Sequence, residues 1–341
     1  MSWKPEVVKV KKVEKHPNAD SLDIVTIYDD VIVISKLNEY KPGDLASYLP
    51  LDTIPGDHDV FKILGSDTNK RIKAKKLRGI FSTGLIVKAP EGFKEGDSII
   101  DFYNLKRYIS DFEKSEYIIK DDNSLSLHSG SNEKNPKNFE IPYYDIENAR
   151  KYAGLFEFYE CVVITEKLHG ENFSMIHDGE RLWCKSRNFY KRKEVGSKWW
   201  DFPIRENMEE RLSKYPNLAF FGEYIGGVNG FRYDCKIEDK KVIRNFKLFD
   251  IYDVKNKVFI DYEEMLLIAK DVGIETAPEL YKGSWTSLND YKHLCENSST
   301  LNNNHIMEGF VIKSIERKKF TNGDRAILKY ISEKYLLSKH S

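Results

Sequence analysis

The C-terminal part of the chain is built from short apolar or aromatic runs that each carry one or two charged residues. These runs are KSRNF at 185–189, FFGEYIGG at 220–227, FKLFDIY at 246–252, EGFVIK at 308–313 and ILKY at 327–330. Such runs, bounded by Gly, Asn and Asp, predict buried strands whose ends present functional groups to a cleft. We therefore expect a strand-rich domain in which charged side chains gather at the strand ends.

Upstream of these runs lies the string EKLHGENF, from Glu166 to Phe173. An amine that attacks the α-phosphate of a nucleoside triphosphate needs a neutral nitrogen, a close backbone approach to the phosphate, and acceptors that hold the ribose. Lys167 and Gly170 offer the first two features, and Glu171 with Asn172 offers the third. Alone, the string also fits a surface lysine beside a turn glycine. The lysines, arginine and glutamates of the later runs favour the first interpretation, because a site for a triphosphate and a metal ion requires both kinds of charge.

Taken in order, the string and the later runs resemble motifs I, Ia, III, IIIa, IV and V of the covalent nucleotidyltransferases, the superfamily of polynucleotide ligases and mRNA capping enzymes. DNA ligases and capping enzymes usually carry Asp two residues after the lysine, whereas this chain has His169. The fuller string KLHGEN is similar to the RNA ligases that seal nicks in duplex RNA. The resemblance implies an ATP-dependent RNA ligase that joins 3′-OH and 5′-phosphate ends in RNA repair, through AMP carried on Lys167 and an RNA-adenylate.

The resemblance also implies the site residues. It assigns catalytic roles to Lys167, Lys313 and Lys329, and contacts with ATP to Glu166, His169, Gly170, Asn172, Arg187, Glu223, Phe249, Glu308 and Val311. Glu223 and Glu308 would hold a hydrated Mg²⁺ or Mn²⁺ ion, since hard carboxylate oxygens and retained waters suit these metals. Glu223 would also contact the ribose. Arg187 would contact either the 5′-phosphate strand or the ribose.

Two of these residues have a second interpretation. Phe249 would stack on the adenine while Val311 closes the other face, but an aromatic residue in an apolar strand is also typical of a core. Glu166 and Asn172 would contact the base and the reacting phosphates. His169 fits a structural hydrogen-bond partner as well as a catalyst.

The nucleophile needs a neutral amine, whereas a lysine is almost entirely protonated at neutral pH. We therefore expect cations near Lys167, namely Lys313, Lys329 and the metal ion, to lower its pKa. The last motif of the family usually has two lysines separated by one residue, and here only Lys329 matches. Either Arg325 or Lys334 supplies the second charge, or a single lysine suffices.

The N-terminal part reads differently. The alternating segments LDIVTIY, DVIVISKL and GLIVKAP are separated by turn signals, which predicts short strands in a small barrel. The strings KHPNADSL at 15–22 and KKLRGIFSTGLIV at 75–87 resemble the tRNA-binding OB domain of some aminoacyl-tRNA synthetases and their cofactors. An OB module ahead of the catalytic domain matches one RNA ligase subfamily, whereas DNA ligases and capping enzymes carry it afterwards.

A basic cluster lies within this barrel, at residues 69–78. Its predicted RNA-binding residues are Lys70, Arg71, Lys73, Lys75 and Lys76. OB folds grip nucleic acid through a basic groove, so the cluster would track phosphates. A solvated face of a β-hairpin is the alternative.

We therefore predict an α+β protein with an N-terminal OB-type β-barrel, followed by a nucleotidyltransferase domain of antiparallel sheets flanked by helices. The boundaries are 1–104 for the OB domain, 105–140 for a linker and 141–341 for the nucleotidyltransferase domain. The linker contains a polar stretch at 121–138 that has too few apolar residues for a core. Apolar residues at helical spacing predict helices within 203–215 and 261–273.

Composition restricts the partners and the compartment. The 341 residues include 54 basic and 54 acidic side chains, so RNA binding depends on local patches rather than on a global field. The N-terminus has no apolar signal segment and the chain no membrane-length apolar stretch, so we expect a cytoplasmic or nuclear monomer that binds RNA and no membrane.

The cysteines, at 161, 184, 235 and 295, lack zinc spacing and predict reduced thiols. The absence of a cysteine quartet also disfavours the bacterial NAD-dependent DNA ligases. Two other functions stay open: a capping-type guanylyltransferase, which would use GTP, and a non-enzymatic tRNA-binding protein.

Overall fold

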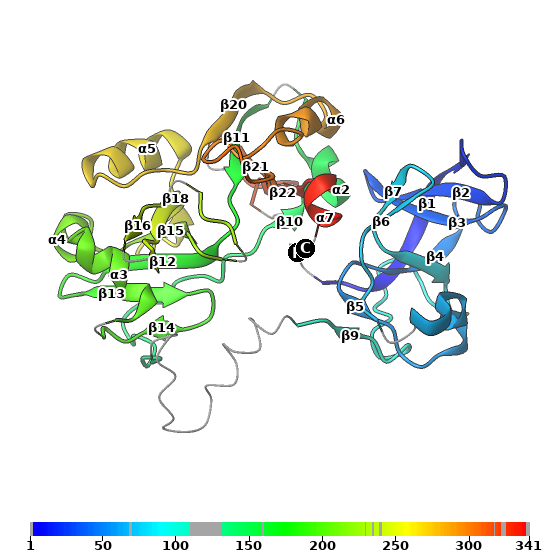
Figure 1. Ribbon diagram of the computed structural model, residues 1–341, viewed down its shortest axis with the longest axis horizontal. Helices are drawn as coiled ribbons and strands as arrows, with labels where there is room; N and C mark the ends of the chain where they lie inside the picture. The colour runs from blue at the N-terminus through cyan, green and yellow to red at the C-terminus, as the bar shows by residue number, and fades with distance from the viewer. Residues whose placement is uncertain are drawn as a thin grey trace. The chain divides into compact units, whose positions relative to one another are not determined.

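A computed structural model of the chain describes residues 3–67, 70–109, 131–158, 160–194, 196–228, 230–233, 235–238, 241–316, 318–321 and 325–338. The chain forms two compact units (Figure 1). The N-terminal unit comprises Met1–Asp121, Ile146–Gly154 and Glu333–Ser341, and the central unit comprises Asp122–Asp145 and Leu155–Ser332.

The N-terminal unit is built on a five-stranded antiparallel sheet with the strand order β3-β2-β1-β4-β8. The strands are β1 (Glu6–Lys15), β2 (Leu22–Ile27), β3 (Val31–Lys36), β4 (Leu45–Leu49) and β8 (Leu85–Lys88). Buried residues alternate with more exposed ones along β2 and β3, as the apolar alternation in the sequence predicts. The alternation turns one face of each strand toward a core of valines, isoleucines and tyrosines.

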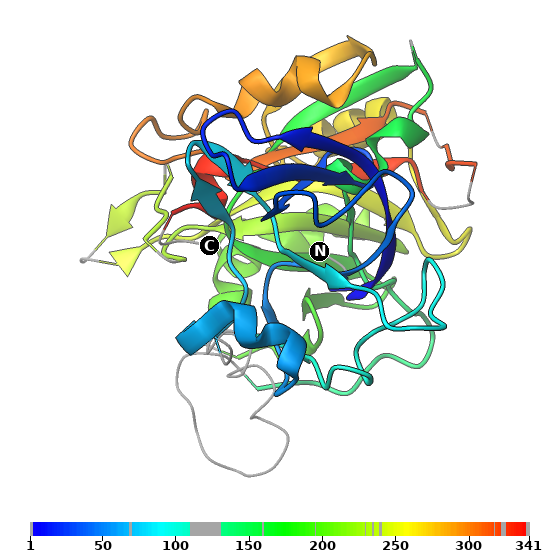
Figure 2. The same ribbon diagram turned by 90° about the vertical axis from the view of Figure 1, so that its right-hand side faces the viewer.

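The first strand bends so that it can serve both halves of the barrel (Figure 2). Residues 6–9 of β1 pair with β4, and residues 10–15 pair with β2. A bulge between Val10 and Lys12 separates the two pairings, and bulges increase strand bending and twist. The Thr83 N–H donates to the Ile32 carbonyl over 2.9 Å, which ties the β8 end of the sheet to β3. These features make the N-terminal unit the predicted OB fold.

A long insertion joins β4 to β8 and carries the basic cluster. Its elements are β5 (Thr53–Ile54), the 3₁₀ segment η1 (Asp59–Asp67), β6 (Lys75–Leu77) and β7 (Ile80–Ser82). β6 and β7 form a hairpin, and β5 pairs with β9 (Lys106–Arg107). A second core, which includes Phe61 and Ile72, holds the insertion against the barrel strands.

Two later segments also belong to the N-terminal unit: one holds β10 (Glu147–Asn148) and α2 (Ala149–Tyr152), and the other holds α7 (Glu333–Leu336). The buried Arg150 guanidinium lies 2.9 Å from the Asp30 carboxylate, in the turn between β2 and β3. The Lys151 ammonium lies 4.6 Å from the Tyr28 ring centroid. These contacts explain why residues distant in sequence pack on the barrel.

The central unit contains two antiparallel sheets. One has the order β22-β21-β11-β20, and the other is six-stranded with the order β14-β13-β12-β15-β18-β19. The strands of the first are β11 (Cys161–Lys167), β20 (Glu279–Ser284), β21 (Gly309–Ser314) and β22 (Ile327–Ile331). The strands of the second are β12 (Glu171–His177), β13 (Leu182–Ser186), β14 (Tyr190–Lys191), β15 (Leu218–Ile225), β18 (Asn245–Asp253) and β19 (Val258–Phe259). Every predicted apolar run contributes at least one residue to these strands.

Helices cover one face of the six-stranded sheet (Figure 1). The longest are α3 (Lys198–Arg205), α4 (Met208–Ser213) and α5 (Tyr262–Asp271). The remaining elements of this unit are η3 (Ala153–Leu155, at its boundary), α6 (Leu288–Tyr291), η4 (Lys292–Cys295), β16 (Ile237–Glu238) and β17 (Lys241–Val242). The three helices bury tryptophan, phenylalanine and methionine side chains against the sheet, whereas a second apolar cluster, which includes Ile176, Ala219 and Phe221, lies on the opposite face.

The predicted fold class is confirmed: an OB fold precedes an antiparallel-sheet domain with few helices. The helix expected within 261–273 is α5, whereas the stretch 203–215 holds two helices, because Asn207 has a left-handed conformation with φ of 51°. The domain boundaries at 104 and 141 stay a proposal, and most of the predicted linker lies outside the described residues.

Two negative findings concern the described part of the chain. No disulfide joins any of the four cysteines, all of which are described there. None of the described helices combines the length and the apolar character that crossing a bilayer demands.

Candidate active site

Lys167 is the last residue of β11, where this strand pairs with the start of β21. Lys167 pairs with Gly309, the first residue of β21. Glu308 precedes Gly309 in the chain and therefore lies next to the lysine side chain. The Lys167 Nζ atom lies 2.7 Å from Glu308 Oε1, and the two side chains are 25% and 11% exposed. The strand register therefore joins motif I to motif IV, which lie 141 residues apart.

The other two predicted catalytic lysines share a sheet face with Lys167. Residues paired directly across an antiparallel ladder point to the same side, and so do residues two apart on one strand. Thr165 pairs with Val311, which pairs in turn with Lys329 on β22. Lys167, Val311, Lys313 and Lys329 therefore lie on one face of this sheet.

The six-stranded sheet contributes Asn172 and Glu223, which are paired across β12 and β15. Gly170 precedes β12 and packs tightly here: a Cβ atom at this position would lie 2.6 Å from the Tyr224 carbonyl oxygen and 2.9 Å from Glu223 Cγ. The Gly170 N–H also donates to the Glu223 carboxylate. A glycine is thus needed to bring the backbone after Lys167 close to this carboxylate.

The carboxylates and the lysine shift one another's protonation. Burial raises the pKa of Glu223 to about 8, and the nearby Glu308 charge adds to this effect while Lys167 opposes it. Burial alone would raise the pKa of Glu308, but Lys167 and His169 outweigh it and lower the pKa. His169 Nδ1 lies 3.8 Å from Glu308 Oε2.

The expected depression of the Lys167 pKa is not found. Burial favours a lower pKa, but the Glu308 and Glu223 carboxylates outweigh burial and raise it. The reason is geometric, since the carboxylates lie next to the amine while the predicted cations have other partners. Lys313 Nζ donates to the Phe249 carbonyl over 3.0 Å, and Lys329 Nζ lies 3.2 Å from Asp145 Oδ1.

A buried carboxylate links several of these groups. Asp250 has no exposed side-chain surface, and its Oδ2 atom accepts a hydrogen bond from Tyr144 Oη over 2.8 Å. The same oxygen lies 2.5 Å from Arg325 Nη2, and Oδ1 lies 3.5 Å from Lys313 Nζ. One buried negative charge thus faces two cations, and burial lowers the pKa of Lys313 although Asp250 opposes the shift. Lys334, the other candidate for the missing charge, is exposed on α7.

Glu166 is buried and engaged by a single loop. Its carboxylate accepts hydrogen bonds from Ser299 Oγ over 2.5 Å and from the Thr300 N–H over 2.9 Å. The His169 N–H donates to Tyr233 Oη over 2.6 Å, and the His169 ring packs on Phe231 at 4.5 Å. Two residues of the motif close to Lys167 are therefore held by loops that are distant in sequence.

Arg187 and Phe249 are only partly buried. The Arg187 Nε–H donates to Tyr143 Oη over 2.5 Å, and the side chain lies 3.7 Å from Asp145. Phe249 is the extra residue of a bulge in β18, because Phe221 pairs with Asp250 and the next residue of β15 pairs with Leu248. A bulge redirects a side chain from the regular alternation, and the Phe249 ring lies 4.9 Å from the Tyr144 ring.

The predicted RNA-binding residues belong to the N-terminal unit. Lys70, Arg71, Lys73 and Lys75 line one pocket there, whereas Lys76 is not among its lining residues. The difference follows from the strand, since neighbouring residues of β6 point to opposite faces.

Several residues that shape the site were not predicted from the sequence. These are Tyr144, Asp145, Tyr233, Asp250, Ser299 and Thr300. Only Asp250 left a signal, because it interrupts the apolar run FKLFDIY. The others lie in loops whose partners are distant in sequence.

The residues present fit a divalent cation bound partly through its substrate. Glu223 and Glu308 supply two carboxylates beside Lys167, and the Glu308 charge adds to the burial that raises the pKa of Glu223, so a cation bound here would stabilise both carboxylates. Within the described ranges, no group of three or more His, Cys, Asp or Glu side chains is arranged to hold a metal. Mg²⁺ commonly uses one or two carboxylates together with phosphate oxygens and waters.

An OB fold together with an antiparallel-sheet unit that holds a lysine beside two carboxylates defines the class of covalent nucleotidyltransferases. The RNA ligase family model matches residues 160–331, and an OB-fold domain model matches residues 5–89. The chain belongs to the RNA ligase family.

Solved structures and curated proteins give further similarities. A mutant of Naegleria gruberi RNA ligase with ATP and Mn has a TM-score of 0.81 and 20% identity, covering 98% of each chain. The same ligase with PPi has a TM-score of 0.80, 21% identity and coverage of 98% of each chain. These identities establish a shared fold.

Among curated proteins, the phenylalanine–tRNA ligase β subunit of Malacoplasma penetrans is 31% identical over 152 residues, which is 41% of this chain and 18% of that protein. The same subunit of Leptospira interrogans is 33% identical over 99 residues, or 28% of this chain and 11% of that protein. The chain thus spans less than a fifth of the length of these curated relatives.

Proposed function

We propose that this protein is an ATP-dependent RNA ligase that seals 3′-OH/5′-phosphate breaks in RNA. The observation that carries the proposal is Lys167 at the end of β11, 2.7 Å from Glu308 and within the segment that matches the RNA ligase family. In the first step the Lys167 amine attacks the α-phosphorus of ATP. A P–N bond forms, the bond from the α-phosphorus to the bridging oxygen breaks, and pyrophosphate leaves.

The amine must lose a proton before it attacks, and the structure offers an acceptor. Glu308 Oε1 already receives the hydrogen bond from Lys167 Nζ, so it is placed to take the proton. Lys313 and Lys329, on the same sheet face, would stabilise the charge on the phosphates. Arg325 would supply the second charge of the last motif, because it shares the Asp250 carboxylate with Lys313.

Glu223 and Glu308 would hold Mg²⁺ or Mn²⁺, and solved structures of the Naegleria ligase are described with ATP and Mn or with AMP and Mn. A bound divalent cation neutralises phosphate charge and counteracts the carboxylates that raise the Lys167 pKa. Asn172 and Gly170 would approach the phosphates, and Glu223 would contact the ribose.

The remaining motif residues would contact the nucleotide or the RNA, or would position the residues that do. Phe249 and Val311 would hold the adenine, and Arg187 would bind the 5′-phosphate strand or the ribose. Glu166 and His169 would act mainly by fixing the turn that carries Lys167, since loop side chains bind both. Each of these roles concerns positioning, which is the larger part of catalysis in phosphoryl transfer.

In the second step AMP moves from Lys167 to the 5′-phosphate of the break, and in the third the 3′-hydroxyl displaces AMP. Broken RNA would be the substrate, held partly by the N-terminal unit. The protein would act as a monomer in the cytoplasm or nucleus.

The test uses the full-length Lys167→Ala variant and the matched variant Lys193→Ala, which changes an exposed lysine of the same unit. After incubation with ATP and Mn²⁺, intact-mass measurement should detect an AMP adduct on the wild type and on Lys193→Ala only. Lys167→Ala should still seal some pre-adenylated RNA, because only the first step uses this amine. An adduct at full yield on Lys167→Ala, or labelling by GTP in place of ATP, would contradict the proposal.

A further inference from the structure

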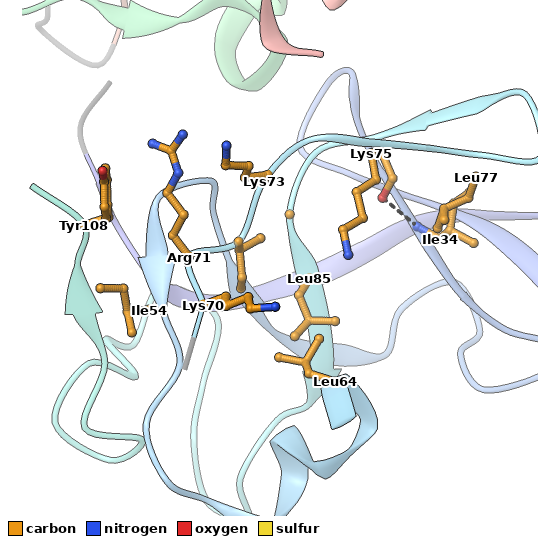
Figure 3. A pocket seen from close by; sticks show the side chains of 13 residues that line it. Ile34, Ile54, Leu64, Lys70, Arg71, Lys73, Lys75, Leu77, Leu85 and Tyr108 are labelled. Carbon is orange, nitrogen blue, oxygen red and sulfur yellow. Dashed lines mark hydrogen bonds between the residues drawn. The ribbon is translucent and has the colours of Figure 1, made fainter. Parts of the chain in front are cut away.

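The N-terminal unit contains a pocket of about 700 Å³ on the insertion between β4 and β8 (Figure 3). Its apolar lining comes from β3, η1 and β8, through Ile34, Leu64 and Leu85. Tyr108 and four basic side chains complete the wall. A pocket of this size with an apolar wall and several cations suits a planar ring that carries an anionic group.

The cations of the pocket are not equivalent. Arg71 Nη1 lies 3.1 Å from Asp52 Oδ1, and its guanidinium carbon lies 4.4 Å from the Tyr108 ring centroid. Asp52 thus neutralises the charge of Arg71, and Arg71 packs against the Tyr108 ring. Lys73 and Lys75 are exposed and form no ion pair with any residue that the structure describes. In Figure 3 the Lys70 and Lys75 side chains extend into the space beside Leu85.

The hairpin that carries Lys75 is fixed rather than loosely attached. His16 Nε2 lies 3.1 Å from the Leu77 carbonyl oxygen, and the Asn18 side-chain amide donates to the Arg78 carbonyl over 3.0 Å. These contacts join the string KHPNADSL to the string KKLRGIFSTGLIV, which explains why the two occur together. They hold one wall of the pocket in place, as a binding site that must be formed before its ligand arrives requires.

We infer that this pocket binds a single nucleotide of the RNA strand, with the base against Ile34, Leu64 and Leu85 and with two successive phosphates of the strand on Lys73 and Lys75. The inference rests on the proposed function only in naming RNA as the ligand. A strand fits better than a free nucleotide, because exposed Lys76 and Arg78 continue the positive charge along the hairpin beyond the pocket. The contacts with the base are apolar, so the pocket accepts different bases, but its affinity depends on the presence of a base.

The experiment measures binding of a short single-stranded RNA to the full-length protein by fluorescence anisotropy. A series of RNAs carries one abasic residue that is moved along the strand. We expect one position at which the abasic residue weakens binding about tenfold. The variant Leu64→Trp fills the pocket. It should weaken binding of the intact RNA about as much as the abasic residue does in the wild type, and all RNAs of the abasic series should then bind this variant equally.

Charge is tested by the double variant Lys73→Gln/Lys75→Gln against the matched exposed pair Lys41→Gln/Lys94→Gln. Loss of two phosphate contacts to single-stranded RNA should reduce the slope of log affinity against log salt by about 1.4. The matched pair should leave the slope unchanged. Because the double variants change only exposed side chains, they still test the inference if Leu64→Trp fails to fold, as shown by the loss of a cooperative melt.

Two outcomes would overturn the inference. One is a flat abasic series together with a wild-type salt slope for Lys73→Gln/Lys75→Gln. The other is competition by free AMP at the affinity of the intact RNA, which would make the pocket a mononucleotide site. Formation of the AMP adduct on Lys167 is measured on every variant in parallel. A normal adduct with a failed pocket test refutes only the pocket, whereas no adduct on the wild type refutes the proposed function.

Discussion

The packing of Gly170 gives a sharp test of how the site is assembled. Replacing Gly170 by alanine adds one methyl group that would lie 2.6 Å from the Tyr224 carbonyl oxygen and 2.9 Å from Glu223 Cγ. Neither neighbour moves easily, because the first is strand backbone and the second is the stem of a carboxylate side chain on the same strand. Restoring ordinary contact, from 2.6 Å to 3.4 Å, requires the turn after Lys167 to separate from β15 by about 0.8 Å.

The expected effect follows from that displacement. A misplacement of about 1 Å between reacting groups can reduce a rate about 10²-fold. Gly170→Ala should therefore slow formation of the AMP adduct on Lys167 by about two orders of magnitude, while the core of the sheet stays intact. Sealing of pre-adenylated RNA should be impaired less, because the lysine amine no longer reacts in that step.

The assay follows adduct formation by intact mass over time, with a thermal melt of each variant to establish folding. The control is Gly179→Ala, in the turn between β12 and β13, where an added Cβ meets no atom within 4 Å although φ is 103°. This control carries backbone strain but no clash at the site. A folded Gly170→Ala protein that forms the adduct at the rate of Gly179→Ala would refute the reasoning.

Three further predictions concern charge. Because the folded-state pKa of Glu223, about 8, lies above its ordinary value of 4.5, the free energy of unfolding without metal or nucleotide should fall as pH rises between these values. The fall is at most about 1.4 kcal/mol per pH unit. In urea melts at several pH values, Glu223→Gln should reduce the slope of the free energy of unfolding against pH. An unchanged slope would contradict the raised pKa of Glu223. Asp250→Asn leaves the Arg325 cation without its buried partner and should lower the free energy of unfolding by about 3–5 kcal/mol in urea melts. The control Asp271→Asn, at an exposed carboxylate, should lower it far less. Equal losses of stability would argue against the buried network. Glu308→Gln should raise the Mn²⁺ concentration needed for half-maximal adduct formation, and a titration that superimposes on the wild type would remove Glu308 from the metal site.

The strands were predictable because their signals are local. Alternation of apolar residues in 22–36 and apolar runs in the later motifs depend only on neighbouring residues, and strands formed at both places. The predicted helix at 203–215 shows the limit of periodicity. Its apolar spacing is helical, but a left-handed Asn207 divides it, and the sequence pattern does not encode that backbone conformation.

The sequence by itself determined the order of the motifs, the OB fold ahead of the sheet domain, and the residue types of the site. The tertiary structure decided which of these groups meet. The antiparallel register sets Glu308 beside Lys167, and this proximity raises the pKa of Lys167. The motif pattern had predicted a lowered pKa for this lysine. Asp250 gained its role in the same way, because a carboxylate binds whichever cations the fold brings to it. Residue identity is local information, whereas distance and burial, which fix electrostatic energies, depend on the whole fold.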